Sequence, residues 1–325
     1  MVNVNTNLLW LIVGTFGTLA VGTGVRLIAL RNSTTQIVRK RLGSLKVWWV
    51  LAILWSAAAV FGKIGAAVLL ATASWLAMRE YLRFLKREAN VGISAGVVLL
   101  LCGAAHYLLI VTGQREAATW FLPLVCILLL GAVRATTCTT RDYIRTTAGM
   151  FWGAMLLIYA LSHALYLFDI DTPVEPTTGT AGPFLFLILL TEANDIMQAI
   201  VGRKLGKTKI TPEVSPNKSA EGLIGGLLTT GTLSVVLAPF MTTLTLGRGA
   251  FEGVLVSLGA GLAISLAGFL GDINMSAIKR DVGVKDGSAI LPGMGGIIDR
   301  IDSLTFTAPV FYLIVLLANQ IHFNL

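Results

Sequence analysis

Acidic and basic side chains lie close together in one segment late in the chain, residues 271–303. The segment contains Asp272, Asp281, Asp286, Asp299 and Asp302 among the basic residues Lys279, Arg280, Lys285 and Arg300. Carboxylates without histidine or cysteine partners suit a hard cation such as Mg²⁺, and lysine and arginine suit phosphate oxygens. The segment therefore predicts a magnesium and polyphosphate site, although the same composition also fits a salt-bridged loop that binds no ligand.

The same segment contains a glycine-rich stretch, Pro292-Gly293-Met294-Gly295-Gly296. Glycine adopts backbone conformations that other residues avoid, so this stretch can turn tightly. The backbone N–H groups of such a turn can approach an anion closely. We therefore expect the turn to contribute anion-binding amides to the site.

A second polar segment, residues 202–221, carries Lys207, Lys209 and Lys218 near two prolines. Three lysines close to a bilayer surface fit a nucleotide or phosphate site. They fit equally well a simple attraction to anionic lipid headgroups. The segment alone therefore does not decide between these two interpretations.

Two acidic residues, Glu192 and Asp195, lie just before this second segment, inside an apolar run. Because they are three residues apart, they share one face of a helix. Ionisable groups within a membrane segment are costly and usually face a polar cavity or a partner. Asp195 in particular is therefore a candidate site residue.

The elements that must position these residues are long apolar segments. The chain has 325 residues, of which 55% are hydrophobic and 13% are charged, with a net charge of +8 and a mean hydropathy of +0.78. The charged share is about half of that in a soluble domain, so these values exclude a disordered chain and argue against a soluble enzyme. The three cysteines and three histidines are dispersed, which argues against a disulfide framework and against zinc or iron–sulfur chemistry.

Ten apolar runs are long enough for spanning helices, which need about 20 mostly apolar residues each. They lie at roughly 8–30, 47–62, 65–82, 92–113, 118–133, 149–168, 182–201, 222–245, 250–271 and 304–321. The second and third are short, and form either a tight helical hairpin or a pair of partly inserted helices. Close helix approach is expected at Gly225, Gly226, Gly259, Gly261 and Gly268. The sequence thus predicts an all-α polytopic membrane protein with about ten transmembrane helices and catalytic cytoplasmic loops.

Lysine and arginine accumulate in the cytoplasmic loops of membrane proteins. Basic residues concentrate in segments 31–46, 79–90, 134–148, 202–221 and 272–303, which ten spans would place on one side. We therefore expect these loops in the cytoplasm, both termini outside, and the protein in the bacterial inner membrane, with the lipid bilayer as a partner and no nucleic acid. We divide the chain into N-terminal transmembrane helices, residues 1–148, and a C-terminal transmembrane catalytic region, residues 149–325.

Two motifs in the polar segments resemble the signature of the CDP-diacylglycerol synthase family, the phosphatidate cytidylyltransferases. The first is Gly202-Arg203-x-x-Gly206-Lys207, followed by Ser215-Pro216-x-Lys218-Ser219-x-Glu221-Gly222. The second comprises Gly271-Asp272, Ser276-x-x-Lys279-Arg280, Lys285-Asp286, and Pro292-Gly293-x-Gly295-Gly296-x-x-Asp299-Arg300-x-Asp302. Each motif follows a hydrophobic run and the order agrees, so the chain is identified as a family member over at least residues 190–310.

The resemblance implies a polytopic membrane enzyme that transfers a cytidylyl group from CTP to phosphatidate, giving CDP-diacylglycerol and pyrophosphate. It also implies dependence on Mg²⁺ or another divalent metal, and a homodimer. The metal ligands that it implies are Asp272 and Asp299, with Asp286 next, and Lys279 and Arg280 complete the implied catalytic residues. The substrate-binding residues that it implies are Asp195, Lys207, Ser215, Lys218, Ser219, Ser276, Lys285, Arg300 and Asp302.

The chain also departs from the family pattern. Met294 replaces the histidine of the usual Pro-Gly-His-Gly-Gly signature, and Ala289 stands where a second histidine is frequent. Neither methionine nor alanine donates a hydrogen bond or transfers a proton as histidine does. The chain is therefore a divergent member, and a different lipid phosphate as substrate or an inactive relative are the alternatives. A transporter is a remote alternative, because the acidic residues concentrate in one loop and the sequence has no clear inverted repeat.

Overall fold

The structure is a computed structural model, and it describes residues 5–31, 35–88, 93–137, 143–170, 175–284, 288 and 295–323. Its elements are α1 (Thr6–Ala29), α2 (Thr35–Val60), α3 (Gly62–Glu88), α4 (Ile93–Val111), α5 (Arg115–Val125), η1 (Cys126–Leu130), α6 (Gly131–Thr137), α7 (Tyr143–Ala154), η3 (Met155–Ala160), α8 (Leu161–Tyr166), η4 (Leu167–Asp169), α9 (Gly182–Leu205), α10 (Ala220–Met241), α11 (Ala250–Asp281), α12 (Ile298–Ile301) and α13 (Leu304–Phe323). Lys209 and Ser219 form an isolated antiparallel β-bridge, and the described ranges are otherwise dominated by helices. The predicted all-α class is confirmed.

Nine helical segments of the described chain are long and apolar enough to cross a membrane. They are Thr6–Ala29, Leu42–Val60, Ile93–Val111, Arg115–Thr137, Tyr143–Asp169, Gly182–Leu205, Ala220–Met241, Ala250–Asp281 and Ile298–Gln320. The predicted span at 65–82 is not among them, although α3 covers it, because Lys63, Arg79 and Glu80 shorten its apolar stretch. A tight turn at Gly62, where φ is 64°, separates α3 from α2.

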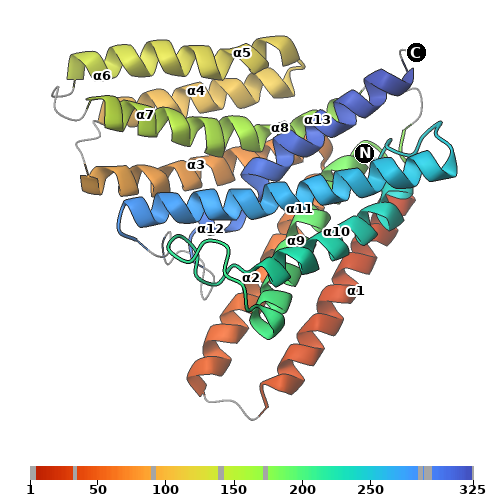
Figure 1. Ribbon diagram of the computed structural model, residues 1–325. Helices are drawn as coiled ribbons and strands as arrows, with labels where there is room; N and C mark the ends of the chain where they lie inside the picture. Colours follow the sequence, from red (N-terminus) through yellow and green to blue (C-terminus); the bar gives the residue numbers. More distant parts are fainter. Residues whose placement is uncertain are drawn as a thin grey trace.

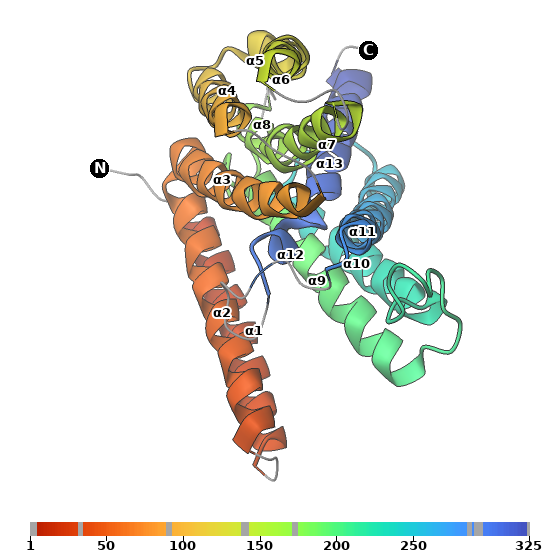
Figure 2. The same ribbon diagram turned by 90° about the vertical axis from the view of Figure 1, so that its left-hand side faces the viewer.

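Most of the helices run side by side in one bundle, which includes α3, α4, α7, α11 and α13 (Figure 1). Figure 2 looks nearly along this bundle, and it shows α1 and α2 diverging to one side and α9 and α10 to the other. The short helix α12 lies between these two pairs. The C-terminal ends of α3, α6 and α11 lie at one end of the bundle, opposite to the start of α1 and the end of α13 (Figure 1).

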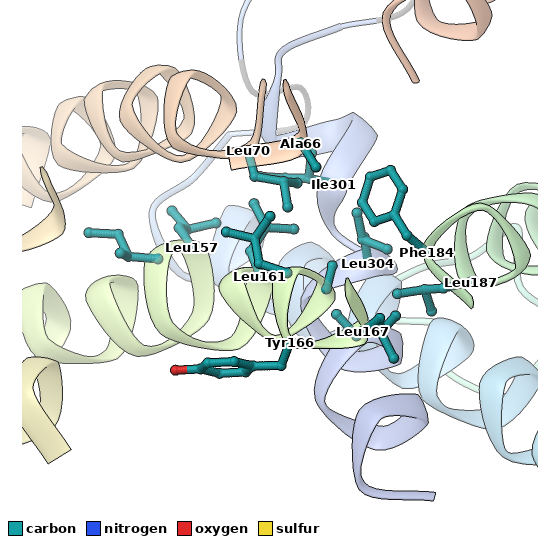
Figure 3. Packing of buried hydrophobic residues seen from close by; sticks show 14 of the residues in the cluster. Ala66, Leu70, Leu157, Leu161, Tyr166, Leu167, Phe184, Leu187, Ile301 and Leu304 are labelled. Carbon is teal, nitrogen blue, oxygen red and sulfur yellow. The ribbon is translucent and has the colours of Figure 1, made fainter. Parts of the chain in front are cut away.

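A buried core forms where α3, α8, α9 and α12 meet (Figure 3). Leu70 of α3, Leu161 of α8 and Phe184 of α9 are fully buried there. Ile301 of α12 and Leu304 at the start of α13 fill the same core and are also buried. Because protein interiors are closely packed, these contacts hold α12 firmly against the bundle. The core thereby fixes the position of the polar residues that α12 carries.

Glycines allow α10 and α11 to approach each other closely. A Cβ atom on Gly261 would lie 2.7 Å from the backbone oxygen of Thr230 and 3.0 Å from the Cα of Gly231. A side chain there would force the two backbones apart. Similar confinement, as predicted, is found at Gly225, Gly226 and Gly268. The prediction is wrong for Gly259, because a Cβ atom there would meet no other atom within 4 Å.

Replacing Gly261 by alanine is expected to destabilise the protein, because overpacking a close contact costs about 1–3 kcal/mol. Gly259→Ala on the same helix is the matched control, since its new methyl group faces open space. Thermal unfolding in detergent measures both variants. The midpoint for Gly261→Ala should fall by roughly 2–8 °C and that of the control should not. Equal midpoints for the two variants would contradict the close approach of α10 and α11.

Candidate functional site

Lys218 joins the two polar segments. Its Nζ lies 2.5 Å from the Oδ2 of Asp272, near the C-terminal end of α11. Lys218 closes a tight turn, in which its N–H donates to the carbonyl oxygen of Ser215 at 3.1 Å. Ser219 then serves as the N-cap of α10, because its Oγ accepts from the N–H of Gly222 at 3.2 Å. The turn and the cap together direct Lys218 towards α11.

Polar side chains of α9 hold Lys218 from another side. The Oε1 of Gln198 accepts a hydrogen bond from the Lys218 Nζ at 3.2 Å, and its Nε2 donates to the Oδ1 of Asn194 at 3.0 Å. The same Oδ1 accepts from the Oγ of Ser265 on α11 at 2.6 Å. Asn194 is fully buried, and buried amides of this kind persist where their hydrogen bonds are satisfied. The network therefore orients Lys218 by linking α9 to α11.

Asp195, Asp272 and Asp302 lie close enough for their charges to interact. Asp195 of α9 accepts a hydrogen bond from the Oγ of Ser303 at 2.8 Å. The charge of Asp195 interacts with those of Lys218 and Asp272, and the charge of Asp302 interacts with both carboxylates. Asp302 is only 8% exposed. Carboxylates this close together repel one another unless positive charge lies between them.

Lys279 and Asp299 form a second ion pair, 2.7 Å long, and each side chain is 11% exposed. Lys279 follows Asp272 by seven residues on α11, so it lies on the same helix face about 10 Å further along the axis. The Oδ2 of Asp299 accepts from the N–H of Gly296 at 2.9 Å, which turns the carboxylate towards α11. The polar cluster therefore follows one face of α11 from Asp272 to Lys279.

Gly296 of the glycine-rich stretch and the two residues after it donate their N–H groups to carboxylates of the protein itself. The N–H of Gly296 donates to Asp299, and the N–H groups of Ile297 and Ile298 donate to Glu80 of α3. We expected amides of this turn to face a bound anion. At these three positions the anions are side-chain carboxylates, and these bonds fix the turn.

Acidic and basic side chains lie together in the described part of this cluster. The carboxylates are Glu192, Asp195, Asp272, Asp299 and Asp302, and the cations are Lys218, Lys279 and Arg300. Among the described residues, no group of three or more His, Cys, Asp or Glu is placed to hold a metal. The donors nevertheless fit Mg²⁺, which proteins often hold by one or two carboxylates together with substrate phosphates.

The remaining predicted site residues lie at the edge of the cluster or outside the described chain. The side chains of Lys207 and Arg280 are exposed, and Arg280 donates to the carbonyl oxygen of Val214 at 3.3 Å. The Oγ of Ser276, one helical turn after Asp272, lies 3.4 Å from its Oδ1. Outside the described residues lie Lys285, Asp286, Ala289, Pro292, Gly293 and Met294.

The sequence analysis missed Asn194, Gln198 and Glu80. Asn194 and Gln198 are spaced for one helix face within an apolar run, a pattern that indicates a functional or structural polar site. Glu80 falls in the basic segment 79–90, where it is not distinguishable from an ordinary loop charge. Its contact with Ile298 spans 218 positions, and nothing near Glu80 in the sequence indicates it.

Comparison with known proteins shows several related sequences. Residues 44–318 match the model of the cytidylyltransferase family. Uncharacterized protein YnbB of Escherichia coli is 38% identical over 268 residues, which cover 82% of this chain and 85% of that protein. The phosphatidate cytidylyltransferase of Thermotoga maritima is 29% identical over 266 residues, or 75% of this chain and 93% of the relative. That of Haemophilus influenzae is 42% identical over 127 residues, which cover 39% of this chain and 43% of the relative.

Replacing Asn194 by alanine is expected to lower the stability of the protein. The variant leaves the side chains of Ser265 and Gln198 without their shared acceptor, and an unsatisfied buried group costs about 1–3 kcal/mol. Thr232→Ala is the control. Among the described residues, the exposed Thr232 hydroxyl donates a hydrogen bond only to the carbonyl oxygen of Leu228 in its own helix, so its loss breaks no hydrogen bond between helices. Thermal unfolding in detergent should show a clearly lower midpoint for Asn194→Ala. A loss no greater than that of the control would argue against the network.

Proposed function

The chain belongs to the cytidylyltransferase family, and from this premise we propose that it transfers a cytidylyl group from CTP to phosphatidate. An oxygen of the lipid phosphate forms a new bond to the α-phosphorus of CTP. The bond between that phosphorus and the oxygen bridging to the β-phosphate breaks, and its electron pair leaves with pyrophosphate. The products are CDP-diacylglycerol and pyrophosphate.

The observation that carries this proposal is the ion pair between Lys218 and Asp272. It joins two polar segments that are far apart in the sequence. Each segment contributes basic groups suited to phosphate, and α11 with α12 adds carboxylates suited to a cation. Bringing these groups together supports a site that aligns two phosphorylated substrates.

Charge repulsion between the two anionic reactants is the first obstacle to this reaction. Mg²⁺ or another divalent metal, when bound, supplies positive charge that neutralises and aligns the two phosphates. We propose Asp272 and Asp299 as its ligands, with Asp286 next.

Lys218 and Lys279 have two tasks in the proposed reaction. Without substrate they neutralise Asp272 and Asp299 through the two ion pairs. When phosphates enter, the ammonium groups turn to phosphate oxygens and leave the carboxylates to the cation. Together with Arg300 they stabilise the charge that develops on the departing pyrophosphate.

The proposed chemistry needs no general base. A phosphate monoester is largely ionised near neutral pH, so the attacking oxygen has no proton to lose. This agrees with a cluster built from carboxylates, lysines and an arginine. His106 and His163 lie elsewhere in the bundle, on α4 and α8, where their rings contact Tyr159.

The position of the cluster suits a lipid substrate. Asp272 and Lys279 lie in the last third of α11, so we expect the acyl chains to remain in the bilayer while the headgroup reaches the polar groups. We place this end in the cytoplasm of a bacterial inner membrane, because basic residues accumulate in the loops on that side. A homodimer is the assembly that the family resemblance suggests.

A different lipid phosphate is the second candidate substrate. Met294 and Ala289 stand where the family signature has histidines, whereas its acidic and basic positions are kept. Those retained residues argue against an inactive relative. The concentration of acidic residues in one segment, 271–303, argues against a transporter, which usually holds such groups near the membrane midplane.

Asp272→Asn is expected to lower CDP-lipid formation by about 100-fold or more, because it removes charge that both the cation and Lys218 require. Glu252→Gln is the matched control on the other end of α11, where Glu252 pairs with Arg248 at 3.2 Å. The measurement is the incorporation of label from CTP into lipid by purified, correctly inserted protein. Full activity of Asp272→Asn would reject its assignment as a metal ligand.

A substrate panel distinguishes the two candidate lipids. Wild-type protein in vesicles receives CTP, Mg²⁺ and one of several lipid phosphates, and the CDP-lipid formed is measured. Phosphatidate should react at least about tenfold faster than the others, a discrimination of ~1.4 kcal/mol, and a chelator should abolish the product. Faster turnover of another lipid phosphate would replace phosphatidate as the substrate. No CDP-lipid from any of them would reject the proposed reaction.

A further inference from the structure

Glu80 is a buried carboxylate of α3 that faces the segment before α12. It is only 1% exposed. It accepts hydrogen bonds from the N–H groups of Ile297 and Ile298 at 3.2 and 3.1 Å, and from the Oγ of Ser288 at 2.5 Å. A buried carboxylate is tolerated only where donors replace its lost hydration. These three donors belong to the segment that leads to Asp299.

Gly296 shows how closely Glu80 approaches this segment. A Cβ atom on Gly296 would lie 2.5 and 2.9 Å from the two carboxylate oxygens of Glu80. On the neighbouring Gly295, where φ is 87°, a Cβ atom would collide with the Oδ2 of Asp299. The two glycines therefore let two carboxylates reach the backbone of a single turn from different sides.

The short helix α12 depends on such external contacts. It has four residues, Ile298–Ile301, and a helix this short is not stable by itself. Its apolar side rests on the core through Ile298 and Ile301, which are 0% and 3% exposed. Its first N–H donates to Glu80. Because Asp299 follows Ile298 directly, fixing that amide also fixes Asp299 relative to Lys279.

We propose that Glu80 is a positioning residue for the cytidylyl transfer. By binding the backbone from which they project, it sets the place of Asp299 and Asp302 against α11. The inference deepens the proposed function. That Glu80 holds the segment can be tested without this function, whereas the effect of Glu80 on the rate of transfer rests on it. It also assigns a task to the N-terminal helices, residues 1–148, because one of them holds the segment that carries the site carboxylates.

The opposite end of α3 offers a matched control. There the Nζ of Lys63 lies 2.5 Å from the Oδ2 of Asp169, with side chains that are 18% and 32% exposed. A carboxylate therefore also anchors the start of α3. Asp169→Asn removes the charge of that anchor without altering the bonds that Glu80 makes.

The experiment compares Glu80→Gln, Glu80→Ala and Asp169→Asn with wild-type protein in lipid nanodiscs. Hydrogen exchange of residues 295–303 should rise by about tenfold or more in Glu80→Ala, because local opening becomes easier. The rise should be smaller in Glu80→Gln, since glutamine keeps one acceptor oxygen but turns an NH₂ group towards the donors. Asp169→Asn should leave the exchange of this segment unchanged.

The same variants are assayed for CDP-lipid formation per folded protein. The kcat of Glu80→Ala should fall by about tenfold or more while the KM for CTP changes by less than about threefold. We expect kcat to change more than KM because Lys218 and Asp272 do not depend on Glu80. Lys218 donates to Gln198 of α9, and it pairs with Asp272. Glu80→Gln should recover part of the lost kcat, and Asp169→Asn should retain the wild-type value.

Each result bears on a separate step. Unchanged exchange in Glu80→Ala overturns the anchoring of the segment, and raised exchange with an unchanged kcat overturns the role in catalysis. An equal loss of kcat in Asp169→Asn also overturns it, because the effect would then be a general destabilisation of α3. If the wild-type protein forms no CDP-lipid, the proposed function fails, and with it the proposed effect of Glu80 on the transfer rate. The exchange comparison still decides whether Glu80 holds the segment.

Discussion

The withdrawal of several carboxylates from water within an apolar bundle is the constraint on which the rest of this structure depends. Carboxylates withdrawn from water are tolerated only when cations or hydrogen-bond donors compensate them. Lys218, which precedes α10, compensates Asp272 on α11, and Lys279 on α11 compensates Asp299 on α12. Because each pair joins different elements, the same charges that favour a cation and phosphates also determine how α10, α11 and α12 meet.

Close backbone approach is the second condition for this cluster. A Cβ atom on Gly271 would lie 2.6 Å from the backbone oxygen of Asp302, so the chain beside Asp272 must be free of a side chain. One turn earlier, a Cβ atom on Gly268 would lie 3.0 Å from the Nδ2 of Asn194. These glycines bring the carboxylates of α11 and α12 together and leave room for the amide network. Gly271 directly precedes Asp272, and a glycine is required there because any side chain would collide with the backbone of Asp302.

Properties that depend on local composition could be predicted from the sequence, and long-range contacts of the backbone could not. A long apolar run indicates a membrane helix without any long-range information, and the all-α class predicted in this way is confirmed. The span predicted at 65–82 is the exception, because charges at both ends of α3 shorten its apolar stretch. The residue types of the cluster around Asp272 likewise follow from the two motifs. The role of Glu80 does not, because its partners Ile297 and Ile298 contribute N–H groups that every residue type except proline possesses. Asn194 and Gln198 could have been predicted, because the sequence places these two polar residues on one helix face within an apolar run.

If the chain carries out the proposed transfer, we expect the loss of the signature histidines to affect the choice of lipid headgroup more than the transfer itself. Met294 directly precedes the two glycines of the signature, and their steric roles do not depend on its side chain: Gly295 makes room for Asp299, and Gly296 for Glu80. The carboxylates that hold α12 in place therefore require no histidine nearby. A phosphate nucleophile that is already ionised needs compensating positive charge rather than a base. The groups that would supply this charge, or hold a cation that does, remain together along α11, so a change at Met294 leaves the charge arrangement of the described site intact.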